Sequence, residues 1–203
     1  ARSAALVSLP HVSTAMASEA QEGSETTGDP VAVLEVAPSG RAKCRGCARL
    51  IAKGEVRLSE RLANPFADDR PLVLLLHAAC AACKRPEAML AALRAWPAEL
   101  PERAVWTALA EIGVVHRRLP RIDGAERAPS GRATCRACRT SIAQGAWRIR
   151  LAIFAETRFE PAGSIHAGCA AAYFGTADVL ERTVIFAPEL TAEERGDLAR
   201  ALG

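Results

Sequence analysis

The fold is decided by the stretch Ala37-Pro38-Ser39-Gly40-Arg41-Ala42-Lys43-Cys44-Arg45-Gly46-Cys47. Residues 128–138 repeat it as Ala-Pro-Ser-Gly-Arg-Ala-Thr-Cys-Arg-Ala-Cys, with changes only at the positions of Lys43 and Gly46. The similarity continues downstream, where residues 51–54 read Ile-Ala-Lys-Gly and residues 142–145 read Ile-Ala-Gln-Gly. A long internal repeat of this kind indicates a chain built from two copies of one structural module.

Each copy combines a Cys-x-x-Cys pair with a later His-x-x-Cys pair. The full patterns are C-x2-C-x29-H-x2-C and C-x2-C-x27-H-x2-C. Three thiolates and one imidazole complete a tetrahedral zinc site that leaves no open position for water, which is the structural kind. We therefore expect two structural Zn²⁺ ions. Their predicted ligands are Cys44, Cys47, His77 and Cys80 in the first copy, and Cys135, Cys138, His166 and Cys169 in the second.

Cys83 is the one cysteine without a place in these patterns. With Cys80 it forms a second Cys-x-x-Cys pair, which can be read as a redox pair or as half of an all-cysteine zinc site. The second copy has Ala172 at the corresponding place and keeps its histidine, so we assign His77 and Cys80 as ligands. Cys83 is then a buried spare thiol. Six cysteines with ligand partners indicate a reducing, intracellular compartment.

The predicted fold class is α+β, with two small zinc-stabilised modules. Each module should have a short antiparallel sheet followed by C-terminal helices. Only 4% of the residues are aromatic, so a metal is expected to supplement each modest core. The predicted organisation is a disordered segment at 1–30, a first zinc finger at 31–115, a basic linker at 116–128 and a second zinc finger at 129–203.

Residue patterns place several elements within these modules. Trp147, Ile149, Leu151 and Ile153 alternate with Arg148 and other small or basic residues, which predicts a strand whose arginine-bearing face is exposed. Further strands are expected at 31–36 and 72–76, and helices at 78–95, 98–112, 168–183 and 191–202. Loops are expected at 63–71 and 155–163. Each loop carries a phenylalanine, Phe66 or Phe159, which we expect at an exposed tip.

Basic residues gather around the first cysteine pair of each copy. Residues 41–61 contain seven Arg or Lys against two Glu, and residues 132–150 contain five Arg and no acid, so both surpluses are +5. Matched surpluses in two copies favour a surface that binds a polyanion. No run approaches the roughly 18 apolar residues that a membrane span needs. We therefore expect no membrane association. We also expect no small-molecule substrate.

These features resemble the PARP-type zinc finger, a family found in nuclear poly(ADP-ribose) polymerases and related DNA repair enzymes. The resemblance rests on Ser39-Gly40-Arg41-Ala42-x-Cys44-x-x-Cys47, the long gap and His77-x-x-Cys80, and on the equivalent pattern from Ser130 to Cys169. It covers most of residues 31–203. Fingers of this family recognise DNA strand breaks by structure rather than by sequence.

The resemblance implies roles for named residues. Arg41 and Arg132 would grip phosphates beside a break, and Arg57 and Arg148 would support them. Phe66 and Phe159 would stack on the base pair exposed at the broken end. Arginine binds phosphates without reading sequence, and a ring can cap a base of any identity.

The implied function is zinc-dependent, sequence-independent binding of DNA strand breaks, as a non-enzymatic damage sensor or repair accessory protein. No room remains for an enzymatic domain of the family. The implied partners are broken DNA and a DNA repair enzyme, and the implied location is the nucleus of a eukaryote or the cytoplasm and nucleoid of a bacterium. The alternative is a zinc-stabilised module that binds a protein or structured RNA. A redox enzyme using Cys80 and Cys83 is a third reading.

Overall fold

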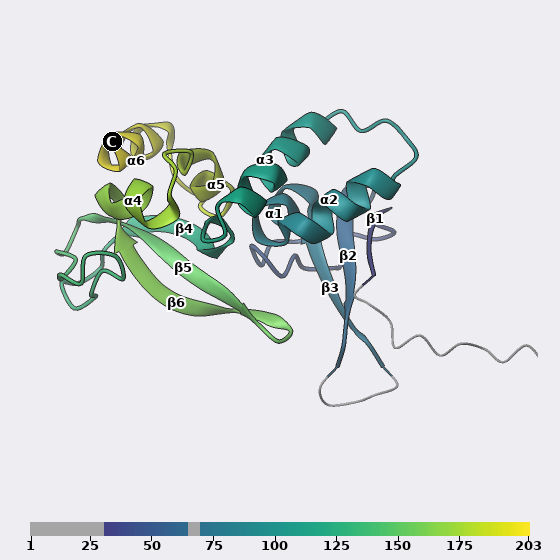
Figure 1. Ribbon diagram of the computed structural model, residues 1–203, viewed down its shortest axis with the longest axis horizontal. Coiled ribbons are helices and arrows are strands. Elements are labelled where there is room, and N and C mark those ends of the chain that lie inside the picture. Colours follow the sequence, from purple (N-terminus) through teal and green to yellow (C-terminus); the bar gives the residue numbers. More distant parts are fainter. Residues whose placement is uncertain (1–30, 65–69) are drawn as a thin grey trace, which may run out of the picture.

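The two predicted modules appear as two three-stranded antiparallel sheets, each followed by helices (Figure 1). The structure is a computed structural model and describes residues 31–64 and 70–203. The segment 1–30, predicted to be disordered, lies outside this range. The α+β fold class is confirmed. The first sheet has the order β1-β2-β3 and the second the order β4-β5-β6.

The first module is built on β1 (Ala32–Val36), β2 (Val56–Leu62) and β3 (Leu72–His77). One face of this sheet carries Leu58, Leu74 and Leu76, all buried. Helices α1 (Ala78–Lys84), α2 (Pro86–Ala95) and α3 (Arg103–Val115) complete the module. The single helix expected at 78–95 is therefore wrong: it divides at Arg85, because a proline at the next position starts a new helix instead of continuing the old one.

The second module begins earlier in the chain than the sequence predicted. The expected linker 116–128 contains the 3-10 helix η1 (Leu119–Arg121) and the strand β4 (Ile122–Arg127), which pairs with β5 (Trp147–Ala155). The linker prediction is wrong here because β4 reads Ile-Asp-Gly-Ala-Glu-Arg, which lacks an alternating apolar pattern. Tertiary pairing rather than local sequence makes this strand.

The loop expected at 155–163 is also wrong. These residues belong mostly to β6 (Arg158–His166), which forms a hairpin with β5 around a turn at Glu156, where φ is 53°. Pro161 and Gly163 suggest a loop, yet β6 is an edge strand and its register with β5 shifts in this region. Proline and glycine are tolerated at edges and bulges, so a strand forms despite them.

One of the two helices predicted in the second module is broken into shorter pieces. The helix expected at 168–183 divides into η2 (Ala167–Cys169), α4 (Ala170–Phe174) and α5 (Leu180–Ile185). Gly175 ends α4 in the left-handed conformation, with φ 75°. The last helix, α6 (Ala192–Leu202), matches the predicted range and starts at a capping box formed by Thr191 and Glu194. Every helix in the described residues is too short or too polar to cross a bilayer.

The two modules share one hydrophobic core. It contains Leu74 and Met89 from the first module together with Ile149 and Phe186 from the second. Helix α1 packs against both η1 and α5, and the β5–β6 hairpin extends toward the first module (Figure 1). The chain therefore forms one continuous body in which the second module lies against the first.

Candidate metal centres

Two clusters of three cysteines and one histidine contain all eight predicted ligands. Within each cluster the ligand atoms lie within 4.8 Å of one another, and the cysteines are free thiols rather than disulfides. Sulfur and imidazole donors in a set of four suit tetrahedral zinc, so the donor chemistry fits the predicted metal. The chain is thus positioned to bind two structural zinc ions.

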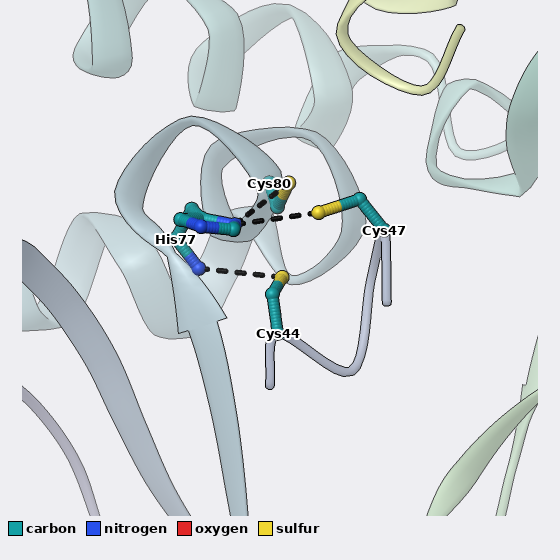
Figure 2. A group of neighbouring side chains, drawn as sticks. All are labelled: Cys44, Cys47, His77 and Cys80. Carbon is teal, nitrogen blue, oxygen red and sulfur yellow. Dashed lines mark hydrogen bonds between the residues drawn. The ribbon is translucent and has the colours of Figure 1, made fainter. Parts of the chain in front are cut away.

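The first centre takes its ligands from three places in the module (Figure 2). Cys44 and Cys47 come from the turn between β1 and β2, His77 is the last residue of β3, and Cys80 lies in the first turns of α1. The four side chains converge on a common point, and the second centre repeats the arrangement. A zinc ion bound by these four ligands would tie the loop, the sheet and the helix together.

Each cysteine turn has the same backbone geometry. Ala48 and Arg139 follow the second cysteine of their pairs and both adopt the left-handed conformation, with φ 61° and 65°. Backbone amides donate to the first sulfur of each pair. The His77 amide lies 3.4 Å from the Cys44 sulfur, and the His166 amide lies 3.3 Å from the Cys135 sulfur. Such donors stabilise a thiolate, which is the form that binds zinc.

Both histidines are oriented by a backbone carbonyl. His77 Nδ1 lies 3.3 Å from the Cys47 sulfur, while its Nε2 lies 3.1 Å from the Leu50 carbonyl oxygen. In the second centre His166 Nε2 lies 3.2 Å from the Ser141 oxygen. Nε2–H therefore donates to the carbonyl, which leaves the lone pair of Nδ1 for the metal. No sequence signal marks these carbonyls, because any residue supplies one.

The two centres differ in their surroundings. Cys44 and Cys80 are buried in the first centre, where Arg49 donates to the Ile185 carbonyl oxygen of α5 at 3.3 Å. In the second centre Cys138 is exposed. The difference follows from the chain order: the second module covers the first centre, whereas nothing in the described residues covers the second in the same way.

Four arginines stand at matched positions around the two centres. Arg41 and Arg132 precede the cysteine pairs, and Arg45 and Arg136 lie inside them. All four are exposed, and within residues 31–64 and 70–203 none forms an ion pair. Arg45 and Arg136 were missed as site residues, although their recurrence in the repeat was a usable signal.

Arg57 and Arg148 are placed differently from the expectation. The Arg57 side chain is 10% exposed and lies 2.7 Å from Glu35 of β1. The Arg148 side chain is 17% exposed and its Nε donates to Glu126 of β4 at 3.0 Å. The predicted exposed face bearing these arginines is wrong, because each guanidinium is drawn onto the carboxylate of the neighbouring strand. Both are structural cross-strand pairs.

Phe159 does not occupy an exposed tip. It lies within β6, half-buried, with its ring centroid 5.0 Å from that of Phe154 and the Lys84 ammonium 5.1 Å away. The expected tip position is therefore wrong, because the ring packs toward the first module. Phe66 lies outside the described residues, and its stacking role stays a prediction from sequence.

Cys83 lies outside the zinc clusters, on α1. Its thiol is buried, and burial raises its pKa to about 11, against the opposing effect of nearby Arg182. A thiol with this pKa stays protonated at neutral pH and is a poor nucleophile. Arg182 is itself buried and donates to the Leu109 carbonyl oxygen of α3. Together they form a polar contact between the modules.

The fold and the donor sets define a tandem protein with two zinc-binding modules. Comparison with known proteins adds no narrower class, since no protein-family model and no curated protein matches the chain.

Proposed function

We propose that this chain is a non-enzymatic, zinc-dependent protein that binds DNA strand breaks without reading sequence. The observation that carries the proposal is a set of exposed arginines around both zinc centres that form no ion pair with any residue the structure describes: Arg41 and Arg45 in the first module, Arg132 and Arg136 in the second. Zinc fixes the backbone from which these side chains project. Guanidinium groups held in this way make bidentate contacts to phosphate.

The duplication strengthens the case for a polyanion. A solvated charged surface has no need to keep arginine at the same place in two copies that differ elsewhere. Single-site contacts to phosphate are weak, and two modules held in one body place their contacts at a fixed separation. The second contact then adds to the first at a high effective concentration. A long, regularly charged ligand such as intracellular DNA profits from this arrangement.

Preference for breaks is the part of the proposal that comes from the resemblance to PARP-type fingers. The test compares three DNAs of one sequence at stated salt: nicked circle, linear duplex with blunt ends and covalently closed circle. We expect nicked and blunt-ended DNA to bind more tightly than the closed circle. Structured RNA of similar charge serves as the fourth ligand and tests the RNA-binding alternative.

The arginines are tested with the same ligands. Arg41→Gln and Arg132→Gln should each weaken binding and reduce the slope of log affinity against log salt by about 0.9, the value of one lost phosphate contact. Arg94→Gln is the matched control, because Arg94 is exposed on α2, away from both cysteine turns. Unchanged affinity in both test variants, or equal affinity for broken and closed DNA, would contradict the proposal.

A further inference from the structure

A small cavity lies at the junction of the two modules. Its volume is about 240 Å³, and the first module contributes the turn of residues 45–48 around the zinc ligand Cys47. The second module contributes Arg150, Phe159 and Phe186 together with neighbouring residues of β4 to β6. This volume is below the ~300–1,000 Å³ of pockets that hold drug-sized molecules. The cavity therefore suits a small group rather than a whole metabolite.

Asp123 lines the cavity and is paired with a buried lysine, Lys84, outside the lining. Lys84 has a fully buried side chain, and its ammonium lies 2.8 Å from the Asp123 carboxylate. The same ammonium lies 4.6 Å from the Phe186 ring centroid and 5.1 Å from that of Phe159. Asp123 is thereby neutralised, so it offers little repulsion to an anion in the cavity. The pair and the rings also hold the modules at a fixed distance.

Two arginines, one from each module, are among the residues that line the cavity. Arg45 is exposed and forms no ion pair within the described residues, while its backbone amide is held 2.9 Å from the Leu75 oxygen of β3. Arg150 is held by its Nε, which donates to the Asp123 carbonyl oxygen at 3.1 Å. Glu126 lies 3.7 Å from Arg150 but is already paired with Arg148. Two cations facing one space repel each other, and an anion between them relieves that repulsion.

We propose that this junction cavity binds a phosphate group, and specifically the terminal phosphomonoester of a DNA end. The inference rests on the proposed binding of broken DNA and deepens it. A phosphomonoester carries about −1.5 to −2 charges at neutral pH, whereas each internal phosphodiester carries −1. Two arginines therefore favour the monoester, and a terminal group enters a small cavity that a continuous backbone cannot fill.

The repeat supplies a matched control. Arg136 occupies the same place in the second module as Arg45 does in the first. No third module lies against it within the described residues, and its side chain rests on Gly163, where an added Cβ would come within 3.0 Å of the Arg136 Nε. We therefore expect Arg136 to contact phosphate from an open turn that faces no other module in the described part of the chain.

The experiment uses the full chain and blunt duplexes that differ only at their ends, bearing 5′-phosphate, 3′-phosphate or hydroxyl groups. Wild-type protein should prefer one phosphorylated end by about tenfold or more, the value of one charge-assisted hydrogen bond. Arg45→Gln and Arg150→Gln should abolish that preference. Arg136→Gln should weaken binding to all ends alike and keep the ratio. Inorganic phosphate should compete with the phosphorylated end more than sodium chloride of equal ionic strength does.

Several outcomes would overturn the inference. One is equal wild-type affinity for phosphorylated and hydroxyl ends, which would leave internal phosphodiesters as the only contacts. Another is a preference that survives Arg45→Gln. Arg45 is exposed, so we expect Arg45→Gln to fold normally. This variant therefore tests the inference even if Arg150→Gln fails to fold. Failure of the proposed function appears separately, as equal binding of broken and closed DNA.

Discussion

Replacement of Asp123 by alanine tests whether the buried pair with Lys84 holds the two modules together. Lys84 is on α1 of the first module, its side chain is 0% exposed, and its ammonium lies 2.8 Å from the Asp123 carboxylate on β4. In Asp123→Ala the ammonium stays buried between Phe159 and Phe186 without its carboxylate. Removal of one partner of a buried pair costs about 3–5 kcal/mol, because the other charge is stranded.

The Asp123 side chain is 36% exposed, so we expect the lower end of that range, about 3 kcal/mol. In a chain of this size 1 kcal/mol corresponds to roughly 2–4 °C in Tm, so the variant should melt about 6–12 °C below wild type. Lys84→Met should cost far less, about 1 kcal/mol, since a flexible apolar chain fills the space between two rings. The Asp123 carboxylate that it leaves unpaired is 36% exposed and can be solvated by water. The double variant should then resemble Lys84→Met rather than the sum of both changes.

The measurement is thermal unfolding by circular dichroism with excess Zn²⁺, so that metal loss does not limit the transition. Arg200→Ala is the control, because Arg200 is 74% exposed and its pair with Asp197 is a surface pair expected to contribute less than about 1 kcal/mol. The reasoning is refuted if Asp123→Ala melts within 2 °C of wild type. It is also refuted if Lys84→Met lowers Tm as much as Asp123→Ala does.

The pH dependence gives a second readout of the same pair. Burial lowers the pKa of Lys84 in the folded state, and Asp123 opposes that effect. Between the lowered folded pKa and the ordinary lysine value of about 10.4, the unfolded chain binds more protons, so stability rises with pH. Without Asp123 the folded pKa falls further and this window widens. The defect of Asp123→Ala should therefore shrink as the pH rises from 8 to 10.

Three further outcomes follow from the zinc centres and the strands. Metal analysis should find two zinc ions per chain and one in Cys135→Ser, and a chelator should empty the second centre first, because Cys138 is exposed. Arg57→Ala should lower Tm and leave DNA affinity nearly unchanged. Arg41→Ala should weaken DNA binding and leave Tm nearly unchanged, as judged by melting and binding titrations. Thr191→Ala should destabilise α6 by about 1 kcal/mol through loss of its capping box, measured by urea denaturation.

The zinc centres can be predicted from the sequence because their ligands can be recognised by residue type and spacing. Only a few residue types bind zinc, their short spacings are fixed by backbone turns, and the repeat shows each spacing twice. The fold class follows from the same repeat. Positions that depend on long-range pairing are harder. The pairing of Glu35 with Arg57 and of Glu126 with Arg148 cannot be predicted from the sequence. It depends on the register of β1 with β2 and of β4 with β5.

The junction between the modules is the part that the sequence hides most completely. Phe159 sits among polar and turn residues and looks like an exposed loop tip, but its ring lies near the ammonium of Lys84, which is 75 positions earlier in the chain. Lys84 looks like a surface residue at the end of a helix. Neither residue has a local reason to be buried. Each residue is covered by contacts with the other module, which the local sequence does not show.

Duplication explains why residues at matched positions have come to differ in role. In an isolated module both cysteine turns would face solvent, and Arg45 and Arg136 would be equivalent. Packing of the second module against the first breaks that equivalence: the turn around Cys47 becomes one wall of a cavity, while the turn around Cys138 stays open. The pair of Lys84 and Asp123 fixes this asymmetry, because its charges are balanced only when both modules are present. A tandem chain of this kind therefore has a surface that neither copy has alone, and Arg45 is the residue through which that surface differs from its repeat.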